Sequence, residues 1–96
     1  MVVGILQVEL MIGGADSLKD KRSVVKSLKD KLHRDYMVSV AEIDAHDKWR
    51  TAVLGLAAVS TSVPHVQGLL DRIVDRLSDD RRFVLSDKRT EILTGH

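Results

Sequence analysis

Three side chains that could bind a metal or exchange protons stand at alternate positions of one short segment. They are Glu42, Asp44 and His46, in the stretch EIDAHD. An extended backbone would point two carboxylates and an imidazole to one side, and such a set suits a divalent cation. The same letters are typical of a strand that runs into a polar turn. We favour the turn, and expect no metal, no cofactor and no enzymatic activity, with Glu42 bonded to Trp49 or to a cation.

The stretch Ser17–Asp35 concentrates positive charge, with seven Lys or Arg against three Asp in a chain whose formal net charge is +1. One stripe of the helix expected there holds basic side chains and no acid. The stripe consists of Lys19, Arg22, Lys26, Lys29 and His33. A solvated helix gains more from interleaved acids, so the pattern suggests an anionic partner such as a phosphate backbone. Many exposed helices are simply Lys-rich, however, and a face that only contacts water is the more common interpretation of such a stripe.

Any RNA binding would have to rest on phosphates and shape. An RNA-recognition motif has the same order of strands and helices, but it needs stacking aromatic residues on its central strands. The stretches VVGILQVEL and TAVLGLAAVS contain none. The aromatic residues are Tyr36, Trp49 and Phe83. We expect Trp49 to close the edge of the core, although an exposed aromatic anchor at a protein contact is the alternative.

The elements that position these residues follow from the hydrophobic pattern. Between Val2 and Ile12 apolar residues alternate with polar ones, which predicts a half-buried strand that ends at Gly13 and Gly14. Ser17 can cap the helix that follows. The apolar side of that helix carries Leu18, Val25, Leu28 and Leu32. Lys21 projects toward this side, where we expect its stem to pack while its ammonium reaches water.

The rest of the chain predicts a hairpin, a second helix and a last strand. Tyr36–Asp44 and Arg50–Ser60 are strand-like, and the second is apolar enough for the middle of a sheet, where Gly55 would let a helix or another backbone approach closely. Ser62 can cap the second helix. The run Phe83–Leu93 is mostly polar, as edge strands often are.

This order predicts an α+β fold of the ferredoxin-like type, a split β-α-β-β-α-β arrangement. Its four-stranded antiparallel sheet would carry two helices on one face, in a single domain over residues 1–96. The chain has no cysteine, which agrees with a reducing compartment, and we expect a cytoplasmic protein. No stretch reaches the roughly 18 apolar residues of a membrane span, so we expect no membrane partner.

Several motifs together resemble those of the YlxP-like family, small bacterial proteins with a domain of unknown function numbered 503. The stretches are SLKDKRSVVKSLKDKL, VSVAEID and AVLGLAAVS, with Asp47 and Trp49 in the turn between the last two. The resemblance implies a ferredoxin-like fold and carries no known activity. Because such proteins tend to be encoded beside translation factors and a ribosome-binding factor, it also implies a link to RNA or the ribosome, and we expect no DNA partner. The last stretch, FVLSDKRTEILTGH, departs most from the family pattern.

The uncovered face of the sheet provides a second candidate surface. If the even residues of the first strand face the helices, then Val3, Ile5 and Met11 point the other way. Three apolar side chains on one face are more than a monomer usually presents to water. The leading hypothesis is therefore a binding domain that contacts RNA or the ribosome through the basic stripe. The alternative is a structural or regulatory homodimer paired through the open sheet face.

Overall fold

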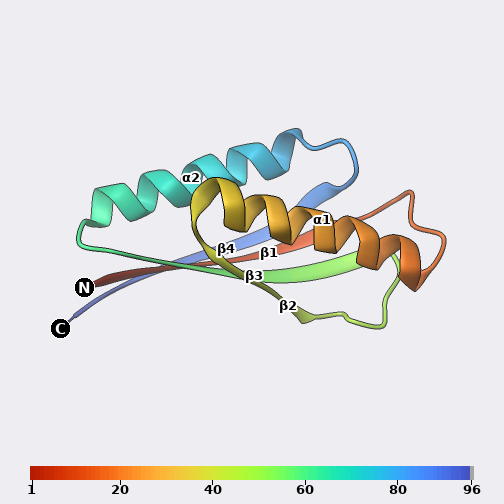
Figure 1. Ribbon diagram of the computed structural model, residues 1–96, viewed down its shortest axis with the longest axis horizontal. Coiled ribbons are helices and arrows are strands. Elements are labelled where there is room, and N and C mark those ends of the chain that lie inside the picture. Colours follow the sequence, from red (N-terminus) through yellow and green to blue (C-terminus); the bar gives the residue numbers. More distant parts are fainter. Residues whose placement is uncertain (96) are drawn as a thin grey trace.

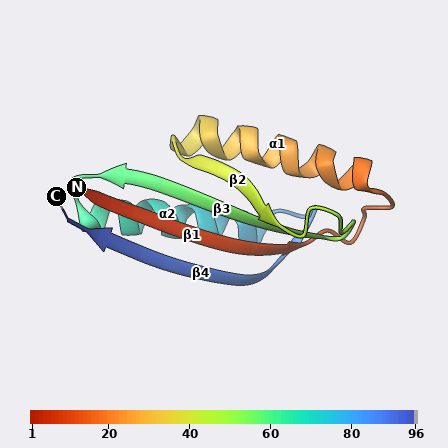
Figure 2. The same ribbon diagram turned by 90° about the horizontal axis from the view of Figure 1, so that it is seen from below.

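The computed structural model describes residues 1–95, and its elements follow the predicted β-α-β-β-α-β order (Figure 1). They are β1 (Val2–Met11), α1 (Leu18–Tyr36), β2 (Ser39–Asp44), β3 (Thr51–Ser60), α2 (Val63–Asp79) and β4 (Val84–Thr94). The strands pair antiparallel in the order β2-β3-β1-β4. Both helices lie on one side of the sheet, and the view from below shows the other side uncovered (Figures 1 and 2). The predicted ferredoxin-like α+β fold is confirmed.

The core lies between the helices and the even-numbered side of β1. Leu6, Val8 and Leu10 are fully buried there. Their partners on β3 share the same face and are buried too, namely Leu56, Leu54 and Ala52. Because α2 packs over β1 and β4 and α1 packs over β2, this layer of side chains lies enclosed between the sheet and the two helices. The central place of β3 and the edge place of β4 are as predicted.

Serine caps define the start of both helices, and a left-handed residue follows the end of α1. The Ser17 hydroxyl accepts a hydrogen bond from the amide of Asp20, and Ser62 caps α2 in the same way. At the other end of α1, Met37 adopts a left-handed conformation and its amide donates to the carbonyl of His33. Within residues 1–95 neither helix is long and apolar enough to cross a bilayer.

A glycine lets α2 approach the sheet, but it is Gly4 and not Gly55. A Cβ built on Gly4 would lie 2.2 Å from Cγ1 of Val66 on α2, a distance that no real pair of carbons adopts. Gly55 has the opposite orientation, since its nearest side chain is that of Ile43 on β2. The expectation that Gly55 makes room for a helix is therefore wrong. Its position on β3 pairs it with Gln7, so it belongs to the open face.

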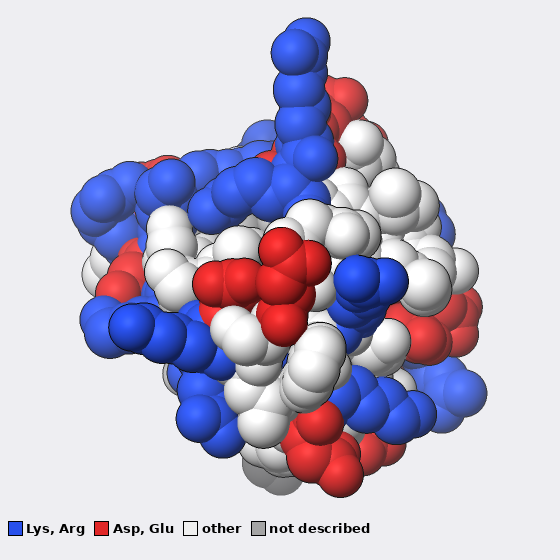
Figure 3. Space-filling model, turned by 90° about the vertical axis from the view of Figure 1, so that its right-hand side faces the viewer, with Lys and Arg blue, Asp and Glu red and all other residues white. Residues whose placement is uncertain are grey.

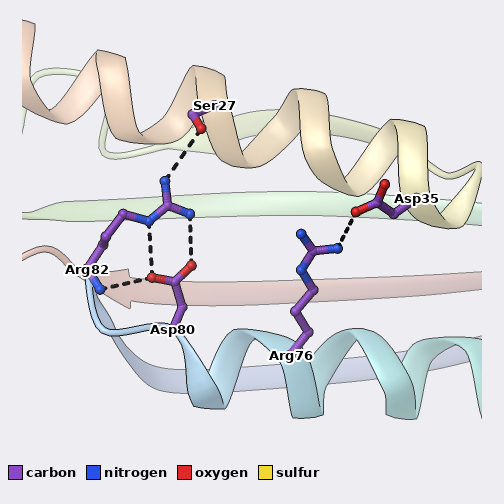
Figure 4. Close-up of polar contacts among 5 residues, drawn as sticks. All are labelled: Ser27, Asp35, Arg76, Asp80 and Arg82. Atoms are coloured by element: carbon purple, nitrogen blue, oxygen red, sulfur yellow. Dashed lines mark hydrogen bonds and ion pairs between the residues drawn. The ribbon is translucent and has the colours of Figure 1, made fainter.

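Polar side chains connect the two helices across their outer surface (Figure 4). Arg76 of α2 donates to Asp35 of α1 at 2.6 Å. Arg82, just after α2, pairs with Asp80 at 2.8 Å and also reaches the hydroxyl of Ser27 on α1 at 3.5 Å. These contacts are partly exposed, so each contributes little to stability.

The Asp35 carboxylate receives two guanidinium donors. Hydrogen bonds from Arg34 and then from Arg76 lower its pKa from 3.8 to about 2. A lowered pKa in the folded state means that the ionised carboxylate favours folding. This contribution is complete above the ordinary pKa of the group and is lost as the pH falls toward 2. Because the site is open to solvent, the effect on stability is small.

Lys21 is the only charged side chain among residues 1–95 that is fully buried, with 0% of its surface exposed. Its ammonium donates to the carbonyl of Ala45 and lies 2.9 Å from Oε2 of Glu42. Ala45 follows β2 in a left-handed conformation, with φ of 59°. Our expectation that the ammonium reaches water is therefore wrong. It instead ties α1 to the end of β2 and to the turn after it.

Replacing Lys21 by methionine tests the contribution of this ammonium. Lys21→Met keeps an unbranched stem of similar length but leaves Glu42 and the carbonyl of Ala45 without their cation. We expect a loss of about 3 kcal/mol in the free energy of unfolding, measured by urea denaturation. Lys19→Met, at an exposed position two residues away, should change stability by less than about 0.5 kcal/mol. Equal stability of the two variants would mean that the stem, and not the ammonium, matters at position 21.

Candidate functional site

The basic stripe lies on the outer side of α1, away from the core. Lys19, Arg22, Lys26 and His33 are exposed, and Lys29 is half-buried. The buried positions of the helix are Lys21, Val25, Leu28 and Leu32, on the opposite side. The sequence therefore placed all five basic side chains on the correct side of the helix. Their electrostatic surroundings differ from the expectation in two respects.

The first difference is an acid beside the stripe. Lys26 forms an ion pair with Asp30 at 3.0 Å, one helical turn further along. Side chains four residues apart are neighbours on a helix, so Asp30 flanks the line of cations although it is not on it. The stripe itself holds no acid, but the expectation that all its cations are uncompensated is wrong at Lys26. Arg22 and Lys29 make no ion pair within residues 1–95.

The second difference concerns His33. Its Nδ1 lies 2.8 Å from the carbonyl oxygen of Val38, beyond the end of α1. A carbonyl only accepts, so Nδ1 carries the proton and donates. The imidazole ring thereby links the last turn of α1 to the backbone just after the helix, close to Met37 with its left-handed conformation. His33 serves the turn between α1 and β2, and the cations available to a ligand reduce to Lys19, Arg22, Lys26 and Lys29.

Three of these cations line a groove between α1 and β2. The groove has a volume of about 390 Å³. Its lining residues are Arg22, Val25, Lys26, Lys29, Asp30 and Glu42. No sequence pattern combines Glu42 with the stripe, because it lies 13 positions after Lys29 and only the packing of α1 on β2 brings the two together. No local pattern could have found this part of the site.

The positive charge is mixed with negative charge over the neighbouring surface. Viewed from the right-hand side of Figure 1, Lys and Arg side chains surround smaller groups of Asp and Glu (Figure 3). A uniform positive field, which would attract any polyanion from a distance, is not present on this side. Binding of an anion would therefore depend on particular side chains at short range.

Glu42, Asp44 and His46 do not form a common site. A β-bulge at Ile43 shifts the register, so that Glu42 pairs with Leu54 and Asp44 with the adjacent Val53. Adjacent residues of a strand face opposite sides, which separates the two carboxylates. His46 Nε2 lies 3.0 Å from the backbone oxygen of Glu42. In the described part of the chain no cluster of three or more His, Cys, Asp or Glu is arranged to hold a metal ion.

The uncovered face of the sheet carries the predicted apolar side chains. Val3 and Ile5 are half-buried, and Met11 is 47% exposed. The pairing of strands adds residues that sequence alone did not assign, since Val59 of β3 and Leu93 of β4 both pair with Val3 and so share its face. Assigning these two residues to the open face requires the strand register, which the local sequence pattern does not specify.

A shallow apolar groove of about 430 Å³ crosses this face near β2. Ile5, Ala41, Ile43, Gly55 and Ala57 line most of it. Gly55, which has no side chain, is one of its lining residues. The face is thus hollowed at the three strands β1, β2 and β3, where its apolar residues gather.

The middle of β4 is polar on the open face, between the exposed apolar side chains of Val84 and Leu93. The exposed polar side chains there are Asp87, Arg89 and Glu91, which pair with Glu9, Gln7 and Ile5 of β1. The apolar region is therefore bordered by charge along one edge of the sheet. Trp49, in the turn before β3, is 52% exposed, so the expectation that it closes the core is wrong.

Comparison with known proteins gives the family of the chain. A family model described as "Protein of unknown function (DUF503)" matches residues 3–90. The match stops at Thr90, inside β4. The chain is similar to the uncharacterized protein YlxP of Bacillus subtilis (strain 168), with 34% identity over 90 residues that cover 94% of this chain and 98% of that protein. The chain therefore belongs to the DUF503 family of proteins of unknown function.

Proposed function

We propose that this protein is a non-enzymatic binding domain that contacts ribosomal or ribosome-associated RNA through the outer side of α1. The observation that carries the proposal is the line of cations Arg22, Lys26 and Lys29 along one groove, with Lys19 one turn before them. The proposal also draws on the translation-linked gene setting of YlxP-like proteins. Under this proposal the RNA partner is cytoplasmic.

The charges around the groove favour a phosphate. Arg22 and Lys29 are seven residues apart, which is two helical turns or about 10 Å along the axis. Two phosphates of one strand can meet two such cations. Lys26, between them, divides its charge between Asp30 and a ligand. Contacts of this kind release counterions and carry little sequence information, so affinity should depend strongly on salt and weakly on sequence.

Charge reversal on α1 tests this function. We expect the double variant Lys26→Glu, Lys29→Glu to lose on the order of tenfold or more in affinity for a structured ribosomal RNA fragment at low salt, and to show a shallower salt dependence. Fluorescence anisotropy at several salt concentrations measures both quantities. The matched control is Arg72→Glu, Arg81→Glu, which makes the same change in net charge at exposed positions on α2 and in the turn after it. Equal binding by the two variants would reduce the stripe to a solvated face.

A second candidate function is supported by the open face of the sheet. Its apolar centre, with Ile5 and the groove beside it, is bordered by the charged edge of β4. An apolar centre with a polar rim is the usual anatomy of a protein interface. We therefore propose a symmetric homodimer in which the same face of two copies is covered.

The association state tests the second function. We expect the wild-type protein to sediment as a dimer at micromolar concentration and Ile5→Lys to sediment as a monomer, because the variant would bury a charge in the junction. Thr61→Lys, which adds the same charge at an exposed position between β3 and α2, should remain dimeric. Circular dichroism establishes that both variants are folded. A wild type that stays monomeric at this concentration excludes the dimer.

A further inference from the structure

The carboxylate of Glu42 has unused capacity to accept hydrogen bonds. Its Oε2 is closed off from solvent and has no hydrogen-bond partner, although the ammonium of Lys21 lies 2.9 Å away. An ionised carboxylate offers about four acceptor positions, and buried carboxylates normally use them. Glu42 also lines the groove beside α1, and its side chain keeps 14% of its surface exposed there. Because Oε2 is closed off and faces the ammonium of Lys21, the acceptor that the groove offers to a ligand is the exposed part of this carboxylate.

The same carboxylate does not repel an anion as a free acid would. Lys21 is fully buried directly against it, so the two form a neutral pair. The remaining charges at the groove are Arg22, Lys26 and Lys29 against Asp30 alone. An anion in the groove therefore meets a net positive lining, with a hydrogen-bond acceptor beside it.

We propose that the groove between α1 and β2 binds a phosphorylated ribose. The phosphate oxygens accept from Arg22 or from Lys29, and a ribose hydroxyl donates to the Glu42 carboxylate. A ligand that satisfies both parts of the lining must carry an anion and a hydroxyl donor close together, as ribose phosphate does. The volume of about 390 Å³ lies in the range of small-ligand pockets.

This inference rests on the proposed RNA-binding function and sharpens it. Within a strand, the 2′-hydroxyl is the group by which a protein distinguishes RNA from DNA. Cations alone bind the phosphates of both polymers. If Glu42 accepts from the 2′-hydroxyl, one nucleotide in the groove gives the protein a preference for RNA without any reading of bases. A free ribonucleotide offers the same chemistry as a second source of the ligand.

A double variant isolates the acceptor. Lys21→Met, Glu42→Leu replaces the buried ion pair by two apolar side chains, a change that is often neutral for stability, and it leaves the net charge of the protein unchanged. Arg22, Lys26 and Lys29 remain in place. The probes are a 12-nucleotide RNA, the DNA of the same sequence, the 2′-O-methyl RNA, and AMP beside its 2′-deoxy form. Affinities are measured by anisotropy for the polymers and by calorimetry for the nucleotides.

We expect the wild type to bind RNA about tenfold more tightly than DNA or 2′-O-methyl RNA, and the double variant to bind all three as the wild type binds DNA. The methylated RNA removes the donor without altering the protein, so the test holds even if the variant does not fold. Preference for AMP over its deoxy form without polymer binding would keep the groove as a ribonucleotide site and overturn the RNA function. Equal affinity of the wild type for RNA and DNA would overturn the role of Glu42 while phosphate binding stands. Binding to none of the probes would overturn both proposals.

Discussion

The position of β2 depends on one buried ammonium. Lys21 lies on the inner side of α1 and contacts both Glu42 at 2.9 Å and the carbonyl of Ala45. Desolvating a lysine is costly, and only a complete set of partners offsets the cost. Ala45 supplies one partner by adopting a left-handed conformation that a residue with a Cβ disfavours. Lys21 thus contacts both β2, through Glu42, and the start of the turn that carries Trp49, through Ala45.

Two grooves follow from that arrangement, and β2 forms a wall of both. Glu42 points to the helix side and borders the groove beside α1, whereas Ile43 borders the apolar groove on the open face. Glu42 and Ile43 serve opposite surfaces because side chains alternate along a strand, and the bulge at Ile43 then turns Asp44 to the side opposite Glu42. The polar groove and the apolar groove thus lie on opposite faces of the same edge strand. A ligand in one groove and a protein partner on the other face would not compete for space, but they would share the strand whose position Lys21 fixes.

The basic side of α1 offers fewer free cations than its composition indicates. Asp30 neutralises part of Lys26, and the ring of His33 is engaged by the carbonyl of Val38. Arg22 and Lys29 keep their charge for a partner. This pattern is typical of a surface that binds at short range, where individual hydrogen bonds decide the affinity, and not of one that gathers polyanions through a long-range field.

The sequence alone determined the order of elements, the helix caps at Ser17 and Ser62, and the outward side of the basic stripe. These features depend on residues a few positions apart, where hydrophobic period and capping chemistry act directly. What only the tertiary structure decided involves partners distant in the chain: the burial of Lys21, the glycine at position 4 that admits α2, and the presence of Glu42 in the groove. Strand register and the packing of α1 on β2 set these contacts. A one-residue bulge is enough to reverse the side that a residue faces, and no local pattern in the sequence specified it.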